Sequence, residues 1–222
     1  MPTPFQFPTT YFLREGRGNL RECIRLSCDA ALAHAIRKLV IFTAAGEGPR
    51  IAIQEFLPLP EYSKLNIVAV TFPAGRIPAS ISPEDRELFR SSDVPLVQAH
   101  LPFDPIHGTF GERGEGQGLS LLGSALEIFC GSMNLCVQAA LVACDAGVVE
   151  TGEHVIVLTS DTSILVRACP TCHFLRNFVV REIFCKPALL SISKQEGVRK
   201  ERKKPTEIVA ETKELPSKPS KR

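Results

Sequence analysis

The sequence predicts an α/β domain built on a mainly parallel β-sheet. Short apolar runs alternate along the chain with stretches whose apolar residues recur at helical spacing. The apolar runs are continuous rather than alternating, which is typical of strands covered on both faces. With 222 residues and 44% hydrophobic content, the chain is long enough to bury one substantial core.

The first helix is expected within residues 18–38. Apolar side chains fall on one face at helical spacing from Leu20 to His34. Asn19 as N-cap and Glu22 three residues later match the reciprocal capping box. On this face we interpret His34 as a packed side chain rather than a ligand.

Five short apolar runs are expected to form strands. They are residues 38–43, 65–72, 94–99, 154–159 and 163–168. Only a tight turn separates the last two, so that pair should be antiparallel and the sheet mixed. A further apolar stretch, residues 178–187, follows the last of them.

Helices are expected between these strands, over residues 47–57, over residues 82–92 and twice within residues 119–149. Pro49 would lie in a first turn, where its missing N–H costs nothing. Ser82 would cap the next helix with Pro83 in its first position. The long pattern should break near Gly131 and stop at Gly147, where a left-handed residue would end the helix.

Three parts are expected along the chain: an N-terminal extension (residues 1–10), the α/β domain (residues 11–190) and a disordered basic tail (residues 191–222). Residues 194–222 hold ten Lys and Arg against five Asp and Glu, so the tail is near +5 and the rest near −3. Few large apolar residues occur there to offset the entropy of ordering. Because no aromatic residues are interleaved, a solubilising tail is favoured over nucleic-acid binding.

The sequence indicates a cytoplasmic protein. No apolar run approaches the roughly 18 residues of a membrane span, and the first residues lack the layout of a signal peptide. Most of the eight cysteines lie in apolar helical patterns, which favours reduced core thiols.

No metal or cofactor is expected. The string "CPTCH", Cys169 to His173, matches a haem-attachment motif, but chance is favoured because such attachment needs an exported chain. A regulatory disulfide between Cys169 and Cys172 stays open. His100, Asp104 and His107 form a loose triplet without an evident fourth ligand.

Three stretches carry a resemblance to a known family: "YFLREGRGNLRE" from Tyr11, "FCGSMNLCVQAALVACDAGVV" from Phe129 and "VVREIFCKP" from Val179. They resemble the C-terminal domain of pyruvate kinase and, more closely, the stand-alone, mostly uncharacterised pyruvate kinase alpha/beta domain proteins. The matching positions are Tyr11, Phe12, Gly16, Asn19, Glu22, Cys136, Asp145, Ala146, Gly147, Arg181, Glu182, Lys186 and Pro187. The resemblance implies a three-layer α/β/α sandwich of about five strands, in the order 3-2-1-4-5 with the last antiparallel. It also implies a homo-oligomer.

This strand order predicts where a ligand would bind. Ligands of open α/β sheets bind beyond the carboxyl ends of strands where the winding reverses, here between the first and fourth strands. The candidate ligand-binding residues therefore lie in two turns: Thr43, Gly46, Gly48, Thr159, Ser160, Asp161, Thr162 and Ser163.

The first turn is only partly suited to phosphate. A glycine turn at a helix start can bind an anion through backbone N–H groups. Compared with allosteric pyruvate kinases, however, the turn lacks two hydroxyls and both cations, and Glu47 would repel a phosphate. A purely structural turn, an anion site and a site for a neutral polyol all stay open.

The leading interpretation is a non-catalytic, free-standing relative of that regulatory domain, which binds a small polar or phosphorylated metabolite. The catalytic residues of pyruvate kinase belong to its barrel domain. A barrel of this kind needs about 200 residues or more, and no part of this sequence is long enough to form one. One alternative is a small hydrolase or lyase that uses Asp145, Cys136 or Glu182, although Asp145 could equally satisfy a helix end. Another is an assembly or scaffold protein whose basic tail recruits an acidic partner.

Overall fold

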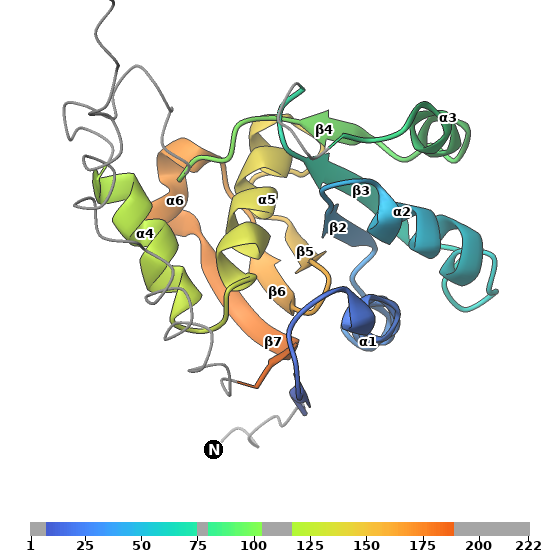
Figure 1. Ribbon diagram of the computed structural model, residues 1–222, viewed down its shortest axis with the longest axis horizontal. Helices are drawn as coiled ribbons and strands as arrows, with labels where there is room; N and C mark the ends of the chain where they lie inside the picture. Colours follow the sequence, from blue (N-terminus) through green and yellow to red (C-terminus); the bar gives the residue numbers. More distant parts are fainter. Residues whose placement is uncertain (1–7, 75–79, 104–116, 189–222) are drawn as a thin grey trace, which may run out of the picture. The chain divides into compact units, whose positions relative to one another are not determined.

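The sheet of this protein has seven strands in the order β1-β7-β6-β5-β2-β3-β4. Figure 1 shows the part of the sheet from β7 to β4. The computed structural model describes residues 8–74, 80–103 and 117–188. Within these ranges no helix is long and apolar enough to cross a membrane. The strands are β1 (Thr10–Phe12), β2 (Lys38–Phe42), β3 (Asn66–Thr71), β4 (Leu96–Gln98), β5 (His154–Leu158), β6 (Ser163–Arg167) and β7 (Val179–Pro187).

The α/β class and the mixed sheet are confirmed, while the strand count is corrected. The five expected strands, β2 to β6, lie in the predicted relative order, and β6 is antiparallel to β5. Two further strands extend the sheet: β7 pairs antiparallel with β6, and β1 pairs parallel with β7. β1 has only three residues, too few for a recognisable pattern, and the first half of β7 is largely exposed.

Helices cover both faces of the sheet, because successive side chains of its central strands point to opposite sides. In β2, Leu39 and Ile41 join one apolar core, and Val40 and Phe42 join the other. The first core is completed by α1 (Leu20–Ala33), α2 (Glu47–Ile51), the π-helix η2 (Ala52–Phe56) and α3 (Pro83–Ser91). The second is completed by α4 (Gln117–Glu127), α5 (Met133–Asp145) and α6 (Phe174–Asn177). This is the expected three-layer arrangement.

The start of α1 differs from the prediction. A short 3-10 helix, η1 (Arg17–Asn19), leads directly into α1, so Asn19 has a helical backbone conformation rather than that of an extended N-cap. The Asn19 side chain donates to the carbonyl of Arg14 at 2.7 Å, and Glu22 pairs with Arg25. The predicted capping box is therefore wrong.

Other helix ends follow the sequence signals. The Ser82 hydroxyl accepts the N–H of Asp85 at 3.0 Å, with Pro83 as the first residue of α3. The helical pattern does break between α4 and α5. Gly147 has φ 73°, and the Val148 N–H bonds back to the carbonyl of Ala143 at 3.1 Å, which closes α5.

Two predicted segments lie outside the described residues. One is the tail of residues 191–222, and the other is most of the loop between β4 and α4, including Asp104 and His107. The division of the chain into an extension, a domain and a tail stays a prediction.

Candidate functional site

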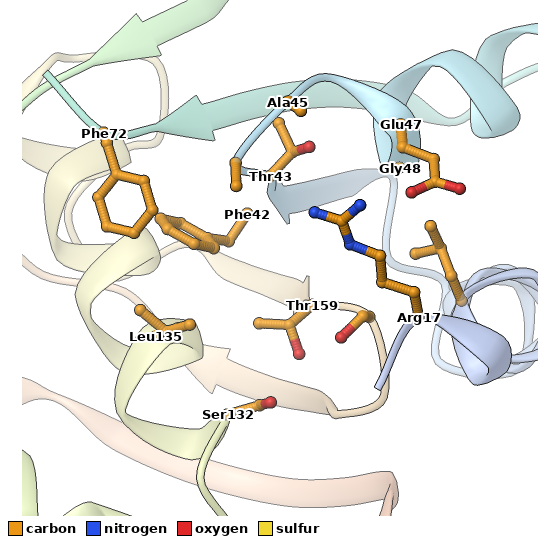
Figure 2. A pocket seen from close by; sticks show the side chains of 13 residues that line it. Arg17, Phe42, Thr43, Ala45, Glu47, Gly48, Phe72, Ser132, Leu135 and Thr159 are labelled. Atoms are coloured by element: carbon orange, nitrogen blue, oxygen red, sulfur yellow. The ribbon is translucent and has the colours of Figure 1, made fainter. Parts of the chain in front are cut away.

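A cavity of about 210 Å³ opens where β2 and β5 end, between the two predicted turns (Figure 2). β2 and β5 are parallel neighbours, so the turns that follow them meet at one edge of the sheet. The cavity is lined by Arg17, Leu20, Phe42, Thr43, Ala44, Ala45, Glu47, Gly48, Phe72, Ser132, Leu135, Thr159 and Ser160. Of the eight residues predicted from the sequence, Thr43, Gly48, Thr159 and Ser160 line it.

The glycines of the first turn have packing roles. Gly46 has φ +93°, and a Cβ there would lie 2.8 Å from Oδ2 of Asp85. A Cβ on Gly48 would lie 2.9 Å from Cγ2 of Ile41, so this glycine lets α2 pack on β2. The Thr43 hydroxyl accepts the Gly46 N–H at 2.9 Å and holds the turn closed. Gly46 therefore lies behind the cavity, against α3.

The second turn divides into residues at the cavity and residues behind it. Asp161, Thr162 and Ser163 are buried, and each hydrogen-bonds elsewhere. The Thr162 hydroxyl donates to Asp161 at 3.1 Å, and the hydroxyls of Ser163 and Ser27 hydrogen-bond to each other at 2.7 Å. These three side chains hold the turn in place and do not line the cavity.

Thr159 is the most distinctive polar group at the site. The residue is only 3% exposed, and its hydroxyl has no hydrogen-bond partner among the described residues. Its nearest hydrogen-bonding neighbour is the thiol of Cys136, whose pKa the Thr159 hydroxyl lowers against the larger effect of burial, and a thiol is only a weak hydrogen-bonding group. Figure 2 shows the Thr159 hydroxyl pointing toward Ser132, another lining residue. A buried hydroxyl left unpaired costs about 1–3 kcal/mol, which a ligand oxygen would recover.

Arg17 supplies a cation that the sequence analysis missed. It is exposed at the mouth of the cavity and forms no ion pair with another described residue. The preceding Gly16 donates its N–H to Asp161 Oδ2 at 2.7 Å, and this bond fixes the segment over the cavity. The sequence offers one weak signal for Arg17, its place between Gly16 and Gly18, because the surrounding stretch has no periodic pattern.

The local field at the cavity is mainly positive. α1 and α5 both start there, since Leu20 is the first residue of α1 and Ser132 is the N-cap of α5. Each helix start carries about half a positive charge and favours a nearby anion by about 0.3–1 kcal/mol. The Ser132 side chain does not cap its own helix, so its hydroxyl can face a ligand. Within the part of the chain that the structure describes, Glu47 is the one carboxylate that lines the cavity.

One wall of the cavity is apolar. The rings of Phe42 and Phe72 meet edge to face, with centroids 5.1 Å apart, and Leu135 and Leu20 extend this surface. Figure 2 shows the two rings on the side of the cavity away from Arg17 and Glu47. The site thus has a charged, hydroxyl-bearing end and an apolar end.

The residues of the hydrolase or lyase alternative do not come together. Cys136 and Asp145 are nine residues apart on α5, about 14 Å along the axis, and burial raises the pKa of the Cys136 thiol. Asp145 accepts the backbone N–H of Thr171 at 2.9 Å. Glu182 lies on β7 with its carboxylate 3.3 Å from His34. None of the three lines the cavity.

No second site emerges from the cysteine motif. Cys169 is buried and Cys172 is exposed, and both thiols are free. In the part of the chain that the structure describes, no group of three or more His, Cys, Asp and Glu side chains is placed to hold a metal ion.

No family model matches this chain. Among solved structures, the chain is similar to a pyruvate kinase of Cryptosporidium parvum, with a TM-score of 0.34, 13% identity and coverage of 70% of this chain. It is also similar to Cryptosporidium parvum pyruvate kinase in complex with ADP, with a TM-score of 0.31, 12% identity and coverage of 82%. The chain spans about a quarter of the length of these enzymes, 24% and 25%.

Proposed function

We propose that this protein is a non-catalytic binding protein that takes up a small polar or phosphorylated metabolite in a regulatory role. One observation carries the proposal: the cavity between the two turns is lined by Thr159, whose buried hydroxyl has no oxygen or nitrogen partner among the described residues, and by Arg17, which forms no ion pair with any of them. Concave sites with a few convergent polar groups are the usual places where small ligands bind.

A binding role is favoured over catalysis by the chemistry of the lining residues. Among the described residues, the cavity lining offers hydroxyls, one guanidinium and one carboxylate, but no cysteine or histidine. The hydrolase or lyase alternative would need Asp145, Cys136 and Glu182 to act at one place, whereas the structure separates them. No observation favours that alternative or the scaffold role.

A thermal-shift screen tests the proposal. Sugar phosphates, nucleotides and polyols at millimolar concentration are added to the full chain, and the melting temperature is recorded. A ligand at about 100 times its Kd stabilises the folded state by about 2.7 kcal/mol, which corresponds to a rise of about 5–10 °C for a domain of this size.

A cavity-filling variant provides the control. Ala45→Trp places a large ring at the lining of the cavity and should abolish the thermal shift. Ala125→Trp, on the exposed face of α4, should leave the shift unchanged. The proposal is wrong if no compound stabilises the protein, or if both variants respond as the unmodified chain does.

A further inference from the structure

We propose that the ligand is a small organic anion with an apolar body, that is, a single carboxylate or phosphate monoester carried on an aromatic or branched aliphatic group. Its head would bind at Arg17, Thr159 and Ser132, and its body would lie against Phe42 and Phe72. This inference rests on the proposed function and names the ligand class for the same cavity.

The position of the head follows from three independent groups. The guanidinium of Arg17 faces the cavity without an ion-pair partner among the described residues. The Thr159 hydroxyl is buried, has no oxygen or nitrogen partner within the described ranges, and is directed toward Ser132 (Figure 2). Ser132 is the N-cap of the 13-residue helix α5, whose first N–H groups and dipole attract negative charge. These three groups line the same cavity and each favours an anion, so we place the head between Arg17 and the start of α5.

Glu47 limits the ligand to one anionic group. This carboxylate lines the same cavity, and Figure 2 shows it on the far side of the Arg17 guanidinium from Thr159. The first anionic group of the ligand would pair with Arg17. A second anionic group would then be repelled by the Glu47 carboxylate, with no cation left to offset the repulsion. The site therefore favours one anionic group over a bisphosphate.

The body is apolar because the side chains of the opposite wall offer no hydrogen bonds. Phe42, Phe72 and Leu135 line this wall, and their side chains contain only carbon atoms. The hydroxyls of a sugar would lose water there without gaining partners, which is unfavourable. A ring instead gains edge or face contacts with the two phenyl groups.

The volume fits a ring with one charged head. A cavity of roughly 150 Å³ is known to hold benzene. The cavity here is about 210 Å³, which leaves space for a carboxylate or a phosphate beside the ring.

Isothermal titration with four probes tests the inference: phenyl phosphate, 3-phenylpropionate, glucose 6-phosphate and inorganic phosphate. Both phenyl-bearing anions should bind at least about tenfold more tightly than glucose 6-phosphate and inorganic phosphate, since burial of the ring adds free energy that the other two lack.

Variants separate the two ends of the ligand. Arg17→Gln should weaken both phenyl probes by about 10- to 100-fold, the usual effect of losing a charge-assisted hydrogen bond. Arg14→Gln, which removes the same charge outside the cavity, should have no effect. Thr159→Val should weaken binding, whereas Thr159→Ser keeps the hydroxyl and should restore it. Phe72→Ala should weaken phenyl phosphate but not inorganic phosphate.

The outcomes distinguish this inference from the proposed function. If glucose 6-phosphate binds as tightly as phenyl phosphate, the ligand class is wrong while a metabolite site remains. The same holds if Arg17→Gln and Arg14→Gln behave alike. If none of the probes binds and the thermal-shift screen is also negative, the proposed function fails together with the inference. Melting curves of each variant establish that it is folded.

Discussion

At the scale of single residues, Gly46 shows how tightly the first turn is packed. Its φ of +93° lies in the left-handed region that residues with a Cβ rarely adopt. A Cβ would also come within 2.8 Å of Asp85 Oδ2, and Asp85 is only 4% exposed. This glycine is required by the turn and by α3, and its presence therefore says little about phosphate.

Gly46→Ala should therefore lower the free energy of unfolding by about 2 kcal/mol, through backbone strain and displacement of Asp85. Gly131→Ala is the matched control, because a Cβ there meets nothing within 4 Å and φ is not positive. Urea denaturation measures both. Equal stabilities of the two variants would show that the turn is more adaptable than its geometry indicates.

The cysteines differ sharply in accessibility. Seven of the eight are buried, and Cys172 alone is exposed. Burial raises the pKa of the thiols of Cys23 and Cys136, and raises that of Cys28 to about 12. The thiolate is the reactive form of cysteine. These thiols therefore react slowly for two reasons: reagents cannot reach them, and their raised pKa keeps them protonated.

In the native protein, one thiol should react rapidly with Ellman's reagent at pH 8, and the other seven should react only on unfolding. Cys172→Ser should remove the rapid phase, whereas Cys169→Ser should leave it intact. Absorbance of the released chromophore measures each phase. Two or more rapid thiols in the unmodified chain would contradict the burial described here.

At the scale of elements, α3 depends on its first turn. The Ser82 hydroxyl accepts the Asp85 N–H, one of the donors that a helix start leaves unpaired. Ser82→Ala should lower the free energy of unfolding by about 1 kcal/mol. Ser91→Ala, at the exposed end of the same helix, should change it by less than about 0.5 kcal/mol. Chemical denaturation compares the two, and equal losses would mean that the cap contributes nothing.

The same turn gives a pH dependence. The backbone N–H of Glu84 and the Ser82 hydroxyl hydrogen-bond the Glu84 carboxylate and lower its pKa. A lowered folded pKa means that the stabilisation is present above the ordinary pKa of a glutamate and is lost as pH falls through the folded pKa. Between pH 5 and pH 3, Glu84→Gln should therefore lose less stability than the unmodified chain, as measured by the urea concentration at the midpoint of unfolding. If the midpoint changes with pH in the same way in both proteins, Glu84 makes no such contribution.

Much of the sheet could be predicted because its central strands are continuous apolar runs. β2, β3 and β5 are buried on both faces, which leaves a clear pattern, and their parallel pairing fixes the order. β1 and β7 escaped the strand count because one is three residues long and the other is partly exposed. The capping box failed because a preceding 3-10 turn, which the pattern does not reveal, changes the backbone of Asn19.

At the scale of the whole molecule, the site combines segments from both halves of the chain. The two turns could be predicted from the strand order, since neighbouring parallel strands bring their following turns together. Arg17 could not, because its position depends on β1 pairing with β7 and on the bond from Gly16 to Asp161, 145 residues away. Such long-range contacts leave no periodic signal in the sequence.

Asp161 therefore connects the fold to the cavity. It is 2% exposed and accepts the Gly16 N–H and the Thr162 hydroxyl. Its removal would leave both donors short of a partner and release the segment that carries Arg17. Asp161→Ala should cost about 1–3 kcal/mol of stability and raise hydrogen exchange over residues 13–19.

The isosteric variant Asp161→Asn separates the bond from the charge. Its amide oxygen can still accept the Gly16 N–H, so residues 13–19 should stay more protected than in Asp161→Ala. Glu87→Ala, an exposed carboxylate on α3, should leave exchange in this segment unchanged. If exchange there is the same in all three variants, the Gly16–Asp161 bond does not hold Arg17 over the cavity. The anion-binding end of the site would then consist of Thr159 and the start of α5 alone.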